Sequence, residues 1–279
     1  MIWKCIFYLA KFLKECKEDN ISAYAAQAAF FILLAVIPFL MVFLSLLQFT
    51  PITESMLLTM YEEGLPSYIS PFFISITDEV YSRSYGITAV SAVAAIWSAS
   101  RGMHALTAGL NTVNDLEENR NWFVLRFWAF IYTVVFMLAI VFTLVVSVFG
   151  NSIRTLALDY LPILRDVAVA LSSFKGVLLF SILVIFFDVV FTVLPNKKHN
   201  FASQLPGAIL GAFAWNGISA LLSIYIDYFN GFSMYGSLTT VVLIMLWLYF
   251  CIYSTLLCAE FNVTFSEGIE NWANRHRKK

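Results

Sequence analysis

The sequence predicts an all-α fold: a polytopic membrane protein with a bundle of six transmembrane helices, an N-terminal amphipathic helix and short helices on the outer face. Hydrophobic residues form 60% of the 279-residue chain and charged residues only 13%, whereas soluble domains carry about 25% charged residues. The mean hydropathy is +0.79. The charges gather in short connections between long apolar runs, which is typical of a protein that crosses a bilayer repeatedly.

Residues 1–22 predict an amphipathic helix on the cytoplasmic surface of the membrane. Ile6, Leu9 and Leu13 share one helical face, while Lys4 and Lys11 lie on another. The lysines are spread through the segment, which is not the order of a cleaved signal peptide. The alternative is that this segment is the solvated start of the first spanning helix.

Six apolar runs of about 20 or more residues follow, each long enough for a hydrocarbon core about 30 Å thick. They are residues 23–49, 87–110, 127–149, 174–194, 203–226 and 237–261. The runs are continuous, which favours helices over barrel strands. We expect residues 1–279 to form a single membrane domain with a core at 23–262 and a basic cytoplasmic tail at 263–279.

The connections carry their lysines and arginines asymmetrically. Six spans put both termini on one side, and that side collects twelve basic residues against four on the other. Positive charge marks the cytoplasmic side, so we expect a bacterial inner-membrane protein with both termini in the cytoplasm. The connection at 50–86 is long and contains prolines at 51, 66 and 71. It predicts short outer-face helices at 52–63 and 72–83, and residues 151–173 predict another.

The second apolar run contains an arginine. Arg101 cannot lose its proton, and a charge in hydrocarbon costs at least a few kcal/mol, so it needs a partner or water. Trp97, Arg101, His104, Ala108 and Asn111 follow a 4-3-4-3 spacing and fall along one helical stripe. The stripe either lines a polar cavity or is a buried anchor that fixes helix packing.

Other polar residues lie in the predicted spans, mostly in their cytoplasmic halves. Arg101 and Asp188 both fall about 9–14 Å below the inner boundary, so an ion pair between them is plausible. Glu260, Gln27 and Asn216 are the further polar positions. We therefore predict a substrate-binding or gating set, open to the cytoplasm as a polar vestibule: Arg101, His104, Asn111, Asp188, Asn216, Glu260, Gln27 and Trp97.

Gly207 and Gly211 form a GxxxG pair just after Pro206, which predicts close helix packing. Enzyme motifs such as HExxH, GxSxG or a P-loop do not occur. We expect no catalytic residue, no cofactor and no metal. The net charge of −1 argues against a nucleic-acid partner. The acidic pair Glu117 and Glu118 is interpreted as solvated loop charge.

The chain resembles the YihY/BrkB family over about residues 22–262. The resemblance rests on an alanine-rich stretch at 25–38 that ends in proline and on the following motifs: WSASRG (97–102), LN (110–111), LP (194–195), LPGA (205–208) with Trp215, YGS (235–237), LWLY (246–249) and AEFN (259–262). The last three motifs are the most specific. Cys258 departs from the family pattern, in which glycine precedes Ala-Glu; cysteine is also small.

The resemblance implies a six-span bacterial inner-membrane protein with no agreed substrate. Some members of the family were once labelled ribonuclease BN, a name regarded as a misassignment. We expect transport or flipping of a lipid or an anionic amphipathic small molecule, with membrane lipids as partners. The alternative is a non-transporting scaffold or regulator of envelope assembly. A ribonuclease or other intramembrane enzyme is the weakest alternative, because no base–nucleophile or metal constellation is present.

Overall fold

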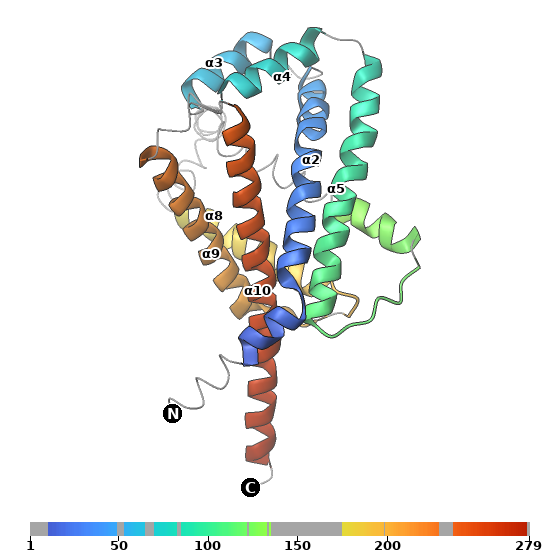
Figure 1. The fold of residues 1–279 in the computed structure, drawn as a ribbon, viewed down its shortest axis with the longest axis vertical. Coiled ribbons are helices and arrows are strands. Elements are labelled where there is room, and N and C mark those ends of the chain that lie inside the picture. The colour runs from blue at the N-terminus through green and yellow to red at the C-terminus, as the bar shows by residue number, and fades with distance from the viewer. Residues whose placement is uncertain are drawn as a thin grey trace, which may run out of the picture. The chain divides into compact units, whose positions relative to one another are not determined.

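The computed structural model describes residues 11–48, 53–64, 70–82, 85–121, 123–132, 134, 175–197, 199–228 and 237–277. Every regular element in these ranges is a helix, which confirms the all-α prediction (Figure 1). The labelled helices are α2 (Ile21–Leu47), α3 (Glu54–Gly64), α4 (Ser70–Ser82), α5 (Tyr85–Val113), α8 (Lys175–Val193), α9 (Phe201–Tyr228) and α10 (Ser237–Arg277). The helices α3 and α4 confirm the two short elements expected in the connection at 50–86.

Three helices in the described ranges are long and apolar enough to cross a membrane: Ile21–Ser45, Phe201–Ile226 and Val241–Thr264. Leu179–Val193 and Phe123–Tyr132 are shorter apolar helices. The helix α5 has 29 residues, a sufficient length, but Arg101, His104 and several serines dilute its apolar character. The count of six spans therefore stays a prediction. Residues 135–149 and the helix expected at 151–173 lie outside the described residues.

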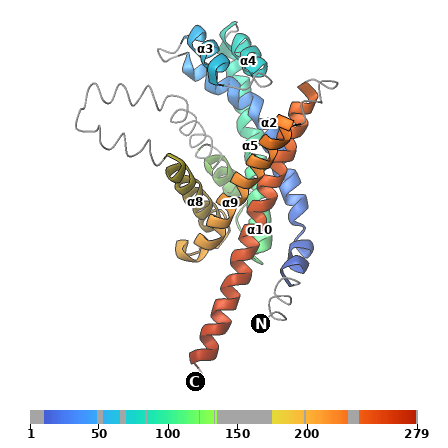
Figure 2. The same cartoon turned by 90° about the vertical axis from the view of Figure 1, so that its left-hand side faces the viewer.

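The chain divides into two compact units. The first unit contains Met1–Ala29, His104–Leu125 and Val169–Lys279, and the second contains Phe30–Met103 and Arg126–Ala168. In the second unit, the C-terminal half of α2 packs on the side-by-side pair α3 and α4 (Figure 2). This core consists of Leu40, Leu44, Leu57, Ile76 and Val80. The outer-connection helices thus bury an apolar face.

In the first unit, α9 packs against both α8 and α10. A Cβ atom at Gly207 would lie 2.5 Å from Asn262 and from the carbonyl oxygen of Cys258, both on α10. A Cβ atom at Gly211 would lie 3.3 Å from the ring of Phe187 on α8. The packing role predicted for the GxxxG pair is confirmed, and each glycine serves a different neighbour.

Asn262 joins the start of α9 to α10 through its amide. Its Oδ1 accepts a 2.7 Å hydrogen bond from the backbone N–H of Gly207. Its Nδ2 donates to the carbonyl oxygen of Gln204 at 3.0 Å and to Oε1 of that residue at 2.8 Å. Asn262 is 3% exposed and Gln204 8%. Because Pro206 lacks a backbone donor and disturbs this turn, the amide satisfies backbone groups that would otherwise be buried unpaired.

Trp215, two turns further along α9, also contacts α10. Its Nε1 donates to the carbonyl oxygen of Cys251 at 2.8 Å and lies 3.0 Å from Oγ1 of Thr255. Its ring meets Phe187 edge to face at 5.2 Å between centroids. Trp215 thus contacts α8 and α10 together, which explains why a large aromatic residue follows the two glycines.

Candidate functional site

The end of α5 is built to turn the chain back on itself. Asp115 has a φ of 51°, the left-handed conformation that often closes a helix. The N–H of Leu116 donates to the carbonyl oxygen of Asn111 at 2.9 Å, and the N–H of Asp115 donates to that of Thr112 at 3.0 Å. This pair of hydrogen bonds is a Schellman motif. It directs the following residues, including Glu118, back toward the helix end.

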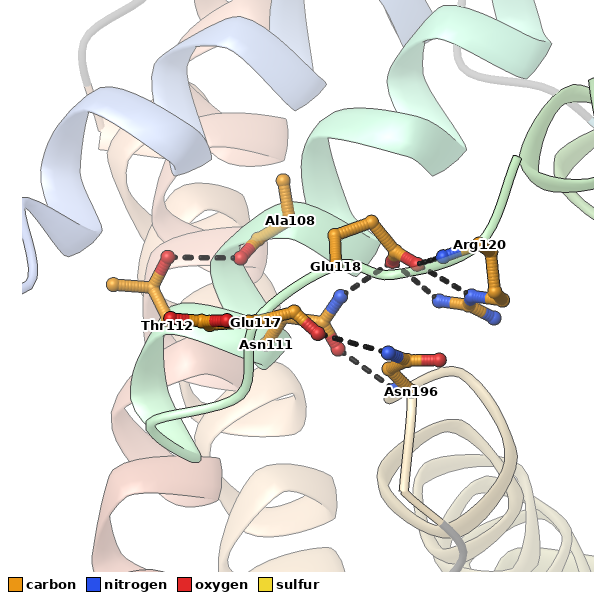
Figure 3. A network of polar contacts seen from close by, with 7 residues as sticks. All are labelled: Ala108, Asn111, Thr112, Glu117, Glu118, Arg120 and Asn196. Atoms are coloured by element: carbon orange, nitrogen blue, oxygen red, sulfur yellow. Dashed lines mark hydrogen bonds and ion pairs between the residues drawn. The ribbon is translucent and has the colours of Figure 1, made fainter. Parts of the chain in front are cut away.

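Figure 3 shows the polar network that results. Nδ2 of Asn111 donates to Oε2 of Glu118 at 2.7 Å. Arg120 donates to the same carboxylate through Nε at 2.8 Å and Nη2 at 2.7 Å. Oδ1 of Asn111 accepts from the backbone N–H of Asn196 at 2.8 Å, and Nδ2 of Asn196 donates to the carbonyl oxygen of Glu117 at 2.8 Å. The network joins the turn after α5 to the segment after α8.

The network bears on the interpretation of two residues. The hydrogen bonds and charge of Arg120 hold the pKa of Glu118 below its ordinary value, against the opposing effect of burial. Glu118 is therefore an exposed loop charge, as interpreted from the sequence, that also accepts hydrogen bonds from Asn111 and Arg120. Asn111 is 3% exposed and uses both ends of its amide within this network. These contacts support the packing-anchor alternative for the Asn111 end of the predicted stripe.

Arg101 lies in the second unit with an exposed side chain on α5. Its guanidinium carbon is 5.4 Å from the centroid of the Phe31 ring and 5.6 Å from that of Trp97, both within cation–π range. Among the described residues no carboxylate forms an ion pair with it. Trp97 is itself 53% exposed. Trp97 and Arg101, at one end of the predicted stripe, therefore form an exposed surface that combines an aromatic ring with a positive charge.

A second arginine reaches the same indole. The guanidinium carbon of Arg126, from the helical segment Phe123–Tyr132, is 4.6 Å from the centroid of Trp97. The charges of Arg101 and Arg126 are close enough to repel each other. Two guanidinium groups without an ion pair to any described carboxylate surround one exposed tryptophan, and they form a positively charged, aromatic surface in the second unit.

Asp188 belongs to the first unit and Arg101 to the second, so the predicted ion pair would join the two units and stays a prediction. Oδ1 of Asp188 is buried and has no hydrogen-bond partner among the described residues. A buried, unpaired acceptor costs free energy. Oγ1 of Thr192, on the same helix, is likewise buried without a hydrogen-bond partner among the described residues.

The remaining predicted positions in the first unit are dispersed. Gln27 is exposed on α2, and His104 is half-buried on α5. Asn216 is exposed, and its Nδ2 donates to the carbonyl oxygen of Ala212 on its own helix at 2.8 Å. The amide of Asn216 therefore bonds within its own helix, and joint membership of these residues in one vestibule stays a prediction.

Glu260 is buried beside the helical segment at residues 11–18. Its Oε1 accepts from Oγ1 of Thr264 at 3.2 Å, and the carboxyl groups of Glu15 and Asp19 lie close to its own. Burial, followed by the charge of Asp115, raises the pKa of Asp19. Three acidic side chains, Glu15, Asp19 and Glu260, therefore lie close together between the N-terminal segment and α10.

Sequence reasoning missed several residues that the structure brings into these sites. Asn196 lies in a polar connection, and Gln204 lies at the start of α9, where neither has a periodic signal. Arg126 entered the sequence argument only as a cytoplasmic charge. Glu15 and Asp19 belong to the amphipathic segment, whose lysines were its more obvious feature. The family motif AEFN was the available signal for Asn262.

The fold defines a helical membrane protein. The chain belongs to the family described as Virulence factor BrkB, whose model matches residues 12–279. A ribonuclease-like protein named YfkH from Bacillus subtilis is 30% identical over 240 residues, which cover 85% of this chain and 87% of that protein. The resemblance found in the sequence motifs is thereby confirmed.

Two further relatives carry a name that states only location in a membrane. A UPF0761 membrane protein of Alteromonas mediterranea is 24% identical and covers 95% of this chain and 90% of its own length. Another, from Vibrio parahaemolyticus, is 26% identical and covers 96% and 85%. No solved structure matches the chain.

Proposed function

We propose that this chain transports or flips a lipid or an anionic amphipathic small molecule, with Arg101 binding the anionic group. The observation that carries the proposal is the environment of Arg101 on α5. Its guanidinium group is exposed beside Phe31 and Trp97, and no described carboxylate forms an ion pair with it. A charge kept in a membrane helix without a fixed counter-charge is a functional feature by default.

The acidic groups supply the other half of the proposal. Asp188 has a buried oxygen without a hydrogen-bond partner among the described residues. Glu260 is 2% exposed and lies close to the carboxyl groups of Glu15 and Asp19. In the proposed cycle Asp188 supplies a negative charge within the first unit. Proton binding at Glu260 couples to the movement of substrate.

The test is lipid movement in proteoliposomes that contain the full chain. A fluorescent anionic lipid in the inner leaflet becomes accessible to an external quencher when the protein moves it. We expect Arg101→Ala to abolish this movement and Lys17→Ala, which removes an exposed positive charge elsewhere, to retain it. Arg101→Lys keeps the positive charge. If this variant retains part of the activity, loss of the charge and not loss of folding explains the result for Arg101→Ala. Full activity of a folded Arg101→Ala variant would remove the proposed role.

The second candidate is a scaffold or regulator of envelope assembly. The observation that favours it is the outer-connection pair α3 and α4, which has its own apolar core on α2. A protein with this role yields a stable partner on mild detergent extraction and shows no lipid movement in proteoliposomes. The two assays together separate the candidates.

The proposal places the protein in the inner membrane and assigns it no ribonuclease activity. The distribution of lysine and arginine supports an inner-membrane protein with both termini in the cytoplasm. The proposal assigns no catalytic activity, because transport of a lipid requires no nucleophile and no general base. Purified protein that is free of contaminating nuclease is expected to leave RNA intact, and cleavage that copurifies with the chain would contradict this assignment.

A further inference from the structure

We infer that Arg101 and Arg126 together bind the phosphate of an anionic lipid whose acyl chain lies along α5. The inference deepens the proposed function and rests on it for the role of the bound lipid. It adds a second binding residue, Arg126, and a definite chemistry: a phosphate group attached to a hydrocarbon chain.

The charges carry the first step. Both guanidinium groups lie over the ring of Trp97, at 5.6 Å for Arg101 and 4.6 Å for Arg126, and they repel each other. Neither forms an ion pair with a described carboxylate. Two cations held together in a medium of low dielectric constant are costly unless an anion lies between or beside them. Arginine forks match the oxygens of phosphate, which makes phosphate the best-suited anion.

The apolar surface beside the arginines carries the second step. A shallow pocket of about 560 Å³ is lined by Val90, Val93, Ala94, Trp97 and Ser98. Val90 and Val93 are 71% and 69% exposed, so this face of α5 is suited to hydrocarbon. Trp97 belongs both to this pocket and to the arginine pair. A ligand that fills both therefore has one anionic end and one apolar end.

The direction of α5 carries the third step. The predicted second span runs toward the cytoplasm, so Arg101 lies nearer the inner boundary than Val90 by roughly 16 Å. Arg126 precedes the third predicted apolar run and lies at the same boundary. A lipid with its phosphate at the arginines and its chain toward Val90 has the orientation of the cytoplasmic leaflet. This match commits the site to a leaflet lipid and not to free phosphate.

The test is calorimetric titration of the purified full chain with dihexanoyl phosphatidic acid. Dihexanoyl phosphatidylcholine is the zwitterionic comparison, and inorganic phosphate is the comparison without a chain. We expect phosphatidic acid to bind at least tenfold more tightly than either. Arg101→Gln and Arg126→Gln should each weaken its binding about tenfold or more, because each removes a charge-assisted hydrogen-bonding fork.

Lys17→Gln is the matched control, since it removes one exposed positive charge outside the site and should leave the affinity unchanged. Arg126→Lys and Arg101→Lys keep the charge and should lose affinity to a smaller extent. Equal binding of phosphatidic acid and phosphatidylcholine overturns the site. Inorganic phosphate that binds as tightly as phosphatidic acid overturns the lipid assignment. Retention of full affinity by a folded Arg126→Gln variant overturns the role of Arg126.

These outcomes are distinct from those of the proposed function. Tight, arginine-dependent binding without lipid movement in proteoliposomes leaves the site standing and rejects transport. Lipid movement that needs Arg101 but not Arg126, in a chain that binds phosphatidic acid and phosphatidylcholine equally, leaves transport standing and rejects the site.

Discussion

Nδ2 of Asn111 donates a 2.7 Å hydrogen bond to Oε2 of Glu118, seven residues further along the chain. The same amide accepts the backbone N–H of Asn196 through its oxygen. One buried side chain therefore fixes the turn after α5 and the segment after α8. The amide of Asn111 both donates and accepts a hydrogen bond, so replacing it is expected to cost stability. The network around it is therefore the first target for mutation.

Glu118→Gln should lower the free energy of unfolding by about 1.5 kcal/mol, because a hydrogen bond to a charged group contributes about 1.5–3 kcal/mol. The lower end applies because the side chain is 27% exposed. Chemical unfolding in detergent micelles measures the difference. Glu117→Gln is the matched control, since Glu117 contributes its backbone carbonyl to the network and its exposed side chain is not used there. Equal effects of the two substitutions would contradict the assigned role.

The stability that Glu118 contributes should depend on pH in a definite direction. Its folded pKa is lowered, chiefly by hydrogen bonds from Arg120. The contribution is therefore present above the unfolded pKa of glutamate, about 4.3, and is lost as the pH falls through the lower folded value. The gap in stability between wild type and Glu118→Gln should persist at neutral pH and close in acid. A gap that widens in acid would show that another group controls it.

Asp19 should show the opposite sign. Burial and the charge of Asp115 raise its folded pKa. Its contribution is fully present below the unfolded pKa, about 3.9, and is lost as the pH rises through the folded value. We expect Asp19→Asn to be more stable than wild type at pH 8 and equal to it at about pH 3, as measured by thermal unfolding. Glu18→Gln, an exposed neighbour paired with Lys14, should change stability by less than about 0.5 kcal/mol.

Gly207→Ala should destabilise the contact of α9 with α10 by about 1–3 kcal/mol, because the new methyl group overlaps a backbone carbonyl that cannot move aside alone. Gly217→Ala lies on the same helix with nothing within 4 Å of the new Cβ atom. It should raise stability by up to about 1 kcal/mol through helix propensity. Thermal unfolding of the two variants in one detergent compares them directly. Similar shifts in both would mean that packing at Gly207 has been misjudged.

Trp215→Phe should cost about 1 kcal/mol, since it removes the indole hydrogen bond to Cys251 but keeps an aromatic ring against Phe187. Trp247→Phe removes an exposed hydrogen bond to Ser219 and is expected to cost less. Unfolding midpoints with both variants test the order. A larger loss for Trp247→Phe would place the main contact of this region elsewhere.

The sequence predicted the helices well because apolar run length is a local property. The boundaries of α8 and α9 lie within two residues of the predicted runs at 174–194 and 203–226. Faces were harder to predict. In α9 large apolar residues occur all around the helix, so periodicity does not tell protein-facing from lipid-facing positions. Only the small residues Gly207 and Gly211 marked the packed side.

The candidate site was predicted less well, for a different reason. The role of Glu118 depends on Asp115, whose backbone is left-handed. Glycine usually marks such a position at a helix end, and the sequence has no glycine there. Arg126 reaches Trp97 through tertiary packing that no spacing rule encodes. Arg101 was found because a charge in an apolar run is anomalous by itself. Its pairing with Asp188 depends on how the two units meet and stays a prediction.

The helix α9 has two faces with different requirements. Gly207, Gly211 and Trp215 meet defined atoms of α8 and α10, whereas Ile209, Leu210, Phe213, Leu221 and Ile224 are exposed. On the packed face the size of each side chain matters to within one methyl group. On the exposed face, apart from Phe213, whose ring packs on Phe180 at 4.7 Å between centroids, only solubility in hydrocarbon matters, so leucine and isoleucine are interchangeable there. A mutational scan of α9 should therefore separate into positions sensitive to volume and positions sensitive to polarity.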